Sequence, residues 1–180
     1  KNAVLKGWDG SGNAAIRYKN VTDGNISGVR TQNSNFGIHL QNSAGVLMSN
    51  NTIRGNSKSI KADGFSGVGE DLTIDSDGTT VSFEAEDVSV SEASNVTGAP
   101  GINEVNIGRS FNAEDRSSHA FLNISVNYTE EDVTGVDEST LQIREYDGTS
   151  WKDIPSSEVD TQTQTVSANI TQFSTFSVQG

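Results

Sequence analysis

Apolar residues recur at a fixed spacing in the first third of the chain. Ile16, Ile38 and Ile60 are separated by 22 residues and again by 22. Each lies in a short stretch that alternates apolar and polar residues, which predicts a β-strand followed by a turn. Strands that repeat in this way are typical of a parallel β-helix, whose coils stack about 4.8 Å apart. The fold expected for residues 1–69 is therefore a short right-handed parallel β-helix of about three 22-residue coils.

The same alternation predicts the direction of each side chain. The side chains expected to point inward are those of Ala14, Ile16, Tyr18, Phe36, Ile38, Leu40, Ile60 and Ala62. Arg17, His39 and Lys61 occupy intervening positions, so they are expected to point outward and stack into a basic ladder. Lys58 stands where an apolar residue is expected, which indicates the end of the helix. Phe65 and Val68 are candidates to cap it, with the next domain covering the open edge.

Turn residues mark the corners of the predicted coils. Asn20, Asn42 and Gly64 follow the three alternating stretches at the same 22-residue spacing. Asparagine and glycine accept the positive φ that such corners require.

The repeat disappears after residue 69, and short strands with acidic loops replace it. About seven strands in roughly 110 residues favour an immunoglobulin-like β-sandwich over residues 70–180. An Asp147-Gly148 turn predicts a hairpin that brings Tyr146 and Trp151 together. The predicted strands are Thr80–Glu84, Asp87–Val90, His119–Tyr128, Thr140–Tyr146, Trp151–Ile154, Thr165–Ile170 and Phe173–Val178.

Two segments resemble known families. GVLMSNNTIRGN (45–56) resembles the right-handed parallel β-helix repeats of the pectate-lyase superfold. GVDESTL (135–141), YDGTSW (146–151) and TVSANITQFSTFSV (165–178) together resemble the C-terminal β-sandwich of secreted haloarchaeal surface proteins, whose usual opening is similar to TVSFEAEDV (80–88). In that family the module often precedes a PGF-CTERM anchoring tail. The resemblance implies an extracellular, cell-surface location and carries no catalytic residues.

Charge is divided unevenly along the chain, whose net charge is −12. Residues 1–69 hold eight bases and three acids, whereas residues 70–180 hold four bases and 21 acids. The two parts therefore carry +5 and −17. An acidic surface suits a halophilic protein that stays hydrated in concentrated salt, and it argues against nucleic-acid binding. The absence of cysteine excludes disulfides, and no apolar run reaches the roughly 20 residues of a membrane span.

Seven Asn-x-Ser/Thr sequons occur, a modest excess over chance that fits an exported glycoprotein. Their asparagines are Asn20, Asn25, Asn50, Asn95, Asn123, Asn127 and Asn169.

The basic ladder is the candidate ligand contact. Arg17, Lys19, His39 and Lys61 are expected to hold the uronate or sulfate groups of an anionic polysaccharide. A solvated face without a ligand is the alternative interpretation. We expect no catalytic residues, because a glycosidase needs two carboxylates facing one cleft and the acids of the first part lie at different coil phases. We also expect no metal site and no cofactor, since the chain has only two histidines.

These observations favour a non-enzymatic extracellular structural or adhesion module of an archaeal cell-surface protein. Two alternatives stay open. One is a polysaccharide-binding or polysaccharide-degrading β-helix whose catalytic coils lie upstream. The other is a self-assembling subunit of a filament or virion appendage. The expected partners are glycans, neighbouring surface proteins or further copies of the chain, with no direct membrane span in this segment.

Overall fold

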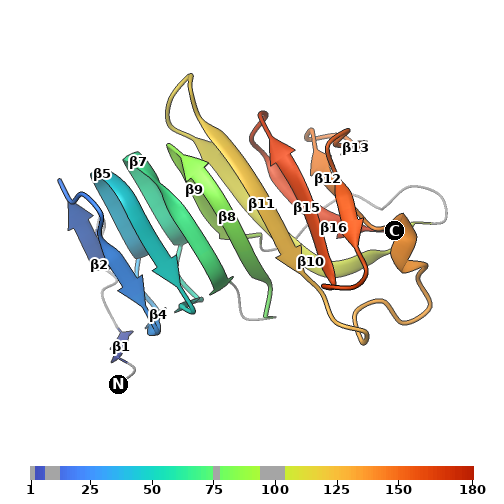
Figure 1. The fold of residues 1–180 in the computed structure, drawn as a ribbon, viewed down its shortest axis with the longest axis horizontal. Helices are drawn as coiled ribbons and strands as arrows, with labels where there is room; N and C mark the ends of the chain where they lie inside the picture. Colours follow the sequence, from blue (N-terminus) through green and yellow to red (C-terminus); the bar gives the residue numbers. More distant parts are fainter. Residues whose placement is uncertain (1–2, 7–12, 75–77, 94–103) are drawn as a thin grey trace.

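One sheet of sixteen strands makes up the molecule (Figure 1). The computed structural model describes residues 3–6, 13–74, 78–93 and 104–180. Within these ranges the only helix is η1 (Glu138–Thr140), a single 3-10 turn. The predicted all-β class is confirmed.

The first seven strands form a parallel stack along one end of the molecule. β2 pairs with β5 and β5 with β7, so that Ile16, Ile38 and Ile60 lie side by side. The register follows the 22-residue spacing of the sequence. A second row runs β1, β4, β6, and β3 adds to β5. The strands are β1 (Ala3–Lys6), β2 (Ala14–Lys19), β3 (Asn25–Ser27), β4 (Val29–Gln32), β5 (Phe36–Ser49), β6 (Thr52–Ile53) and β7 (Lys58–Thr73).

The corners of the stack adopt the backbone conformation that the sequence predicts. Asn20, Asn42 and Gly64 have φ of 55°, 47° and 75°. A buried asparagine supports another corner: the Asn51 side chain accepts a hydrogen bond from the Val29 amide and donates one to the Ile26 carbonyl. Polar side chains therefore satisfy backbone groups that the short strands leave unpaired.

Inward-facing residues form the core of the stack, mostly as predicted. Ile38, Leu40, Ile60 and Ala62 are fully buried. Ala14, Ile16 and Tyr18 belong to the first strand of the row and are only half-buried. The stack therefore lacks a cover on the β2 side among the described residues.

Phe36 does not point inward, which corrects the prediction for this residue. Its ring contacts His39 and the Lys61 ammonium on the outer face. Gly37 takes the inward position instead, where an added Cβ would lie 2.7 Å from the Ser59 carbonyl oxygen and against the Ile53 side chain. Two consecutive inward positions, Gly37 and Ile38, break the strict alternation on which the prediction rested.

Strand β7 connects the parallel stack to the rest of the chain. One edge pairs parallel with β5, and the other pairs antiparallel with β8 (Thr80–Glu86) and β9 (Val88–Glu92). These two strands cover the open edge, as the sequence suggested. Lys58 is accommodated because its ammonium forms an ion pair with Glu114 of β10. The predicted domain boundary, between residues 69 and 70, falls inside β7.

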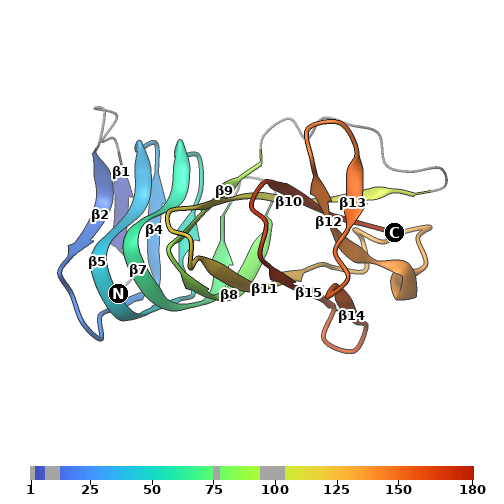
Figure 2. The same cartoon turned by 90° about the horizontal axis from the view of Figure 1, so that it is seen from above.

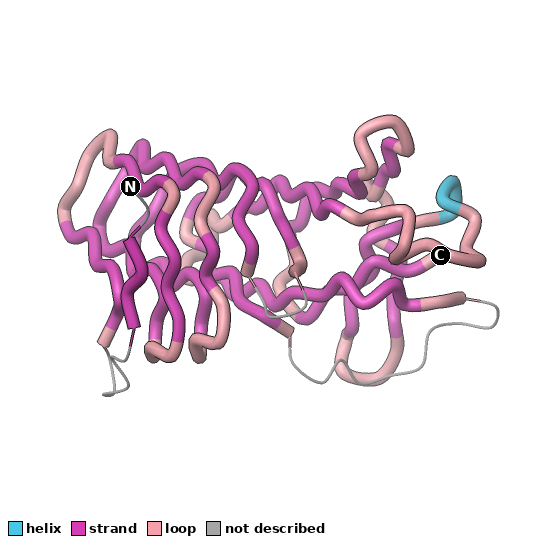
Figure 3. The backbone as a smooth tube through the Cα atoms, turned by 90° about the horizontal axis from the view of Figure 1, so that it is seen from below, coloured by secondary structure: helices cyan, strands magenta, loops and turns pink. Residues whose placement is uncertain are grey.

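Among the described residues, every pairing between strands from β8 onward is antiparallel. These strands give no support to a right-handed parallel β-helix in this part. One branch runs β7, β8, β11, β15, β14, and the other runs β7, β9, β10, β16, β12, β13. The sheet curls so that the branches lie on opposite sides of one core (Figures 2 and 3). The remaining strands are β10 (Asn106–Asp115), β11 (Phe121–Asn127), β12 (Gln142–Tyr146), β13 (Trp151–Asp153), β14 (Glu158–Asp160), β15 (Thr165–Ile170) and β16 (Thr175–Gln179).

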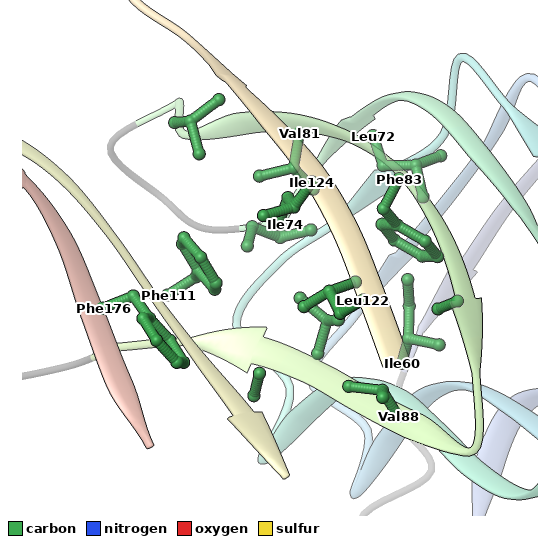
Figure 4. Close-up of a cluster of buried hydrophobic side chains, with 14 of the residues drawn as sticks. Ile60, Leu72, Ile74, Val81, Phe83, Val88, Phe111, Leu122, Ile124 and Phe176 are labelled. Carbon is green, nitrogen blue, oxygen red and sulfur yellow. The ribbon is translucent and has the colours of Figure 1, made fainter. Parts of the chain in front are cut away.

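A continuous apolar core runs from the stack into the curled part. Figure 4 shows Ile60 and Leu72 of β7 beside Val81, Leu122 and other side chains of the antiparallel strands. Farther along, the rings of Phe111 and Phe176 stack with centroids 5.1 Å apart. All the strands are thus held by one connected set of buried side chains.

All seven strands predicted for residues 70–180 are present, one with the predicted bounds (β15) and six with shifted ends, and two more, β10 and β14, were missed. The β12–β13 hairpin is confirmed, with Tyr146 and Trp151 centroids 5.2 Å apart. Among the described residues, no helix has the length and apolar character needed to cross a membrane.

Candidate functional site

The predicted basic ladder lies across three neighbouring strands of the stack. Arg17 of β2 pairs in register with His39 of β5, and His39 pairs with Lys61 of β7. Asp63, two residues after Lys61, and Phe36 lie against these three residues. We name the five residues the His39 cluster. The sequence predicts the register of the ladder correctly, but the surroundings of its central residue differ from the expectation.

His39 is buried rather than presented to solvent, with 2% of its surface exposed. The edge of the Phe36 ring packs against it with centroids 5.4 Å apart, and Arg17 and Asp63 contact its two ring nitrogens. The expectation of an outward ladder of three exposed bases is therefore wrong at its centre, because neighbouring side chains on the outer face fold over the imidazole.

The hydrogen bonds of His39 determine which ring nitrogen carries the proton. Arg17 can only donate, and its Nε and Nη2 lie 3.3 and 3.2 Å from Nδ1 of His39. Nδ1 must therefore accept, which leaves the proton on Nε2. Nε2 lies 2.7 Å from Oδ2 of Asp63 and donates to it. This assignment follows from the network and corresponds to a neutral imidazole.

Asp63 offsets the positive charge of the ladder. The Lys61 ammonium lies 3.0 Å from Oδ2 of Asp63 and 4.7 Å from the centroid of the Phe36 ring. Burial would raise the pKa of the Asp63 carboxyl, but hydrogen bonds from His39 and Lys61 and the charge of Lys61 lower it below its ordinary value of 3.8. With His39 neutral, the His39 cluster carries a formal charge of only +1.

Replacement of the Asp63 carboxylate tests this ionic network. We expect Asp63→Asn to lower the free energy of unfolding at pH 7 by about 1 kcal/mol. A carboxyl whose pKa is depressed by folding stabilises the folded state above its unfolded pKa, and this contribution is lost as the pH falls through its folded pKa. The stabilities of the two proteins, measured by chemical denaturation, should therefore begin to converge below about pH 4 and become equal below the folded pKa of Asp63.

The matched control for Asp63→Asn is Glu84→Gln, which removes an exposed carboxylate from β8. This control should change stability by less than about 0.5 kcal/mol at any pH. A difference between wild type and Asp63→Asn that stays constant from neutral to acidic pH would contradict the ionic interpretation.

The geometry of the cluster limits its chemistry. Both ring nitrogens of His39 are engaged and the ring is buried, so it cannot take a proton from a substrate in this arrangement. Arg17 and Lys19 of β2, by contrast, have exposed side chains on the same strand. They are the cations that this face presents to an anionic group.

Six of the seven sequon asparagines lie within the described residues, and Asn95 lies outside them. Asn127 is half-buried at the end of β11. The other five are exposed: Asn20, Asn25, Asn50, Asn123 and Asn169. Asn123 and Asn169 are paired across β11 and β15, and the amide of Asn169 donates to the side-chain oxygen of Asn123. A sugar on Asn169 would replace one of the two hydrogens of the nitrogen that donates this bond. Glycosylation of the seven sites stays a prediction.

A shallow groove of about 470 Å³, lined by both polar and apolar side chains, lies over the outer face of β7, β8, β11 and β15. Serines form its floor at three successive strands: Ser82, Ser125 and Ser167. Glu84, Asn123 and Asn169 form a parallel row beside them. Sequence reasoning missed this groove. The signal that could have found it is the polar half of the alternation in the three strands, once their register is known.

Other perturbed groups are structural. Burial, with a hydrogen bond to Glu138 and the charges of Glu138 and Asp160, raises the pKa of Tyr128 to about 12. Asp132 accepts from the Arg109 guanidinium, which lowers the pKa of its carboxyl against the effect of burial. In the described part of the chain, no three His, Asp or Glu side chains gather closely enough to hold a metal ion.

Comparison of the chain with protein-family models, curated proteins and solved structures found no match to any of them. The resemblance to haloarchaeal surface proteins therefore stays a prediction.

Proposed function

We propose that this chain is a non-enzymatic extracellular structural module. In this proposal the parallel stack is the end of a right-handed parallel β-helix, and the curled antiparallel part is an immunoglobulin-like sandwich. The observation that carries the proposal is strand β7, which pairs with β5 on one edge and with β8 and β9 on the other. A strand shared in this way leaves no flexible linker between the two parts.

A shared strand makes the molecule a rigid spacer rather than two tethered units. The amide of Phe65 in β7 donates to Asp87, and the amide of Asp87 donates back to the Phe65 carbonyl. The Ala62 amide donates to the Ser89 hydroxyl. These bonds, with the continuous apolar core, oppose bending between the stack and the curled part. A rigid spacer suits a protein that holds a binding or catalytic unit away from a surface.

The sequence supports an extracellular site for this spacer. The charge of −17 on residues 70–180 and the five exposed sequon asparagines fit a glycosylated, halophilic cell-surface protein of an archaeon. The resemblance to haloarchaeal surface modules points to the same location.

The rigidity of the spacer is tested by following both parts during unfolding. We expect one calorimetric transition whose calorimetric and van't Hoff enthalpies agree, as for a single cooperative unit. Hydrogen exchange should give amides of β5 and β15 the same limiting free energy of opening. Two transitions, with β5 opening independently of β15, would overturn the proposal of a rigid spacer.

The non-enzymatic part of the proposal needs a separate measurement. Incubation with polygalacturonate or alginate should leave the chain length of the polysaccharide unchanged, compared with a heat-unfolded sample of the same protein. Shortened chains would replace the proposal by the polysaccharide-degrading alternative.

A further inference from the structure

A pocket of about 400 Å³ opens between the two branches of the curled sheet, where β12 lies against β15 (Figure 2). Glu145 and Phe176 line it from the β12–β16 side, and residues 169–172 line it from the end of β15 and the turn that follows. A volume of this order is typical of sites for small ligands. All the lining residues lie in the segment 145–176, so one internal stretch of the chain builds the whole pocket.

The floor of the pocket is the end of the apolar core. Phe176 and Ile170 lie there with 0% and 2% of their surfaces exposed. Ile154, in the wall, packs against the same core but stays half-buried. A ligand with an apolar body would remove water from the exposed part of Ile154, so the pocket favours a ligand that is not wholly polar.

Glu145 places a carboxylate at a position where alternation along the strand predicts an apolar residue. Leu141 and Ile143 precede it at alternate positions and are fully buried. Glu145 is half-buried, and it pairs in register with Phe176 of β16. Side chains paired across two strands lie on the same face of a sheet, so the carboxylate lies beside the apolar floor.

No ion pair between described residues includes Glu145. Lys152 of β13 pairs with it in register, but the Lys152 ammonium lies 3.5 Å from Oδ2 of Asp147. Arg144, the preceding residue, belongs to the opposite face of β12 and pairs with two other acids. The pocket therefore combines an unpaired carboxylate with an apolar floor, an arrangement that suits a cation with an apolar body.

The wall of the pocket is fixed to both branches by the loop between β13 and β14. The Ser157 hydroxyl accepts a hydrogen bond of 2.8 Å from the Ile143 amide of β12. The Ser156 hydroxyl donates to the Asn169 carbonyl of β15 and accepts from the Asn169 amide, at 2.9 and 3.1 Å. A wall held in this way needs little rearrangement on binding, which lowers the entropic cost of holding a ligand.

We propose that the pocket binds a primary ammonium group on a short alkyl chain, as carried by a lysine side chain or by a free alkylamine. The ammonium donates to the Glu145 carboxylate, and the alkyl chain lies against Ile154 and the floor. An ammonium has three N–H donors. The side-chain oxygens of Thr171 and Gln172, which are exposed residues of the pocket, can accept the donors that Glu145 leaves free.

The charge of the surrounding surface favours the same ligand. Residues 70–180, which include the pocket, carry −17. Such a surface attracts cations and repels anions, so it raises the rate at which an alkylammonium reaches the pocket. This inference goes beyond the proposed function, because a rigid spacer needs no ligand to act.

Titration with n-pentylammonium tests the site. Amide NMR spectra of the whole chain should show saturable shifts at Glu145, Ile154 and Ile170. Affinity should rise from methylammonium to n-pentylammonium, by up to about fourfold for each methylene that becomes buried. The alcohol n-pentanol has the same alkyl chain without the charge, and it should bind at least about tenfold more weakly than n-pentylammonium.

A further probe identifies the source of the ammonium group. Nα-acetyl-lysine N-methylamide presents the lysine side chain with a peptide group on either side. Binding as strong as that of n-pentylammonium would assign the pocket to a lysine side chain of a partner protein. Binding of n-pentylammonium alone would assign it to a free amine, because the rim of the pocket would then exclude the peptide groups.

Removal of the carboxylate gives the sharpest result. Glu145→Gln keeps the shape of the side chain and should weaken binding of n-pentylammonium about tenfold or more, because a charge-assisted hydrogen bond is lost. Glu130→Gln is the matched control: it removes one exposed carboxylate after β11, outside the pocket, and should bind like wild type. Circular dichroism checks that both variants are folded.

Three outcomes would overturn the inference. They are the absence of saturable shifts at the pocket with n-pentylammonium, n-pentanol binding as tightly as the ammonium, and wild-type affinity in Glu145→Gln. None of them alters the single unfolding transition expected for the rigid spacer, so the two proposals fail separately.

Discussion

Ile60→Ala is expected to lower the free energy of unfolding by about 2–5 kcal/mol, the usual cost of a cavity at a fully buried isoleucine. Ile60 is fully buried in β7, in register with Ile38 on one side and with Val90 of β9 on the other. The cavity would lie where the parallel stack meets the antiparallel strands. Guanidinium unfolding followed by circular dichroism measures the loss.

The position of Ile60 also predicts the form of the transition. Because its neighbours belong to both parts, the variant should still unfold in one step with an unchanged slope against denaturant. Val68→Ala is the matched control: Val68 is in the same strand but is 37% exposed, and its loss should cost less than about 0.5 kcal/mol. A variant in which only β2 and β5 become labile would contradict the continuous core.

The period of the stack could be predicted from the sequence, because a parallel register places residues at the same position of successive coils next to one another. Ile16, Ile38 and Ile60 needed only their spacing to be placed side by side. The turn at Asp147 was equally local: its carboxylate accepts from the amides of Thr149 and Ser150 within four residues. Features that depend on spacing or on one turn were accessible from the sequence alone.

The candidate site was predicted only in part, because its decisive contacts are not periodic. The expectation for Phe36 assumed strict alternation, which the inward Gly37 breaks. Asp63 lies within β7, directly before the Gly64 corner, and neither its spacing nor its charge sign linked it to His39, 24 residues earlier. The alternation pattern predicts that side chains on the outer face are exposed to solvent. Here the side chains of neighbouring strands bury the imidazole of His39.

The connection between the parallel stack and the antiparallel part could not be predicted from the sequence, for a similar reason. The change of composition near residue 70 indicated a boundary, yet β7 continues through it to Thr73. Composition reports mainly which residues face solvent, and the net charge does change from positive to negative near residue 70. The hydrogen bonds of β7 do not follow that change, because its free edge is completed by β8 and β9 from the acidic part.

Asn51→Leu is expected to lower the free energy of unfolding by about 2–4 kcal/mol, because it removes hydrogen bonds to two backbone groups at once. Asn51 is 1% exposed, and its side chain lies 2.9 Å from the Val29 amide nitrogen and 2.8 Å from the Ile26 carbonyl oxygen. Leucine has the same number of side-chain heavy atoms in the same branched arrangement, so the loss measured by chemical denaturation does not come from a cavity.

Two further variants separate the hydrogen bonds of Asn51 from its shape. Asn25→Leu makes the same change at an exposed position of β3 and should cost less than about 0.5 kcal/mol. Asn51→Asp keeps an acceptor for Val29 but faces the Ile26 carbonyl with a carboxylate at pH 7. Two effects raise the pKa of the introduced carboxyl: burial disfavours its charged form, and only its protonated form can donate to the Ile26 carbonyl. The variant should therefore gain stability relative to wild type as the pH falls. Wild-type stability in Asn51→Leu would show that water, not Asn51, satisfies this corner.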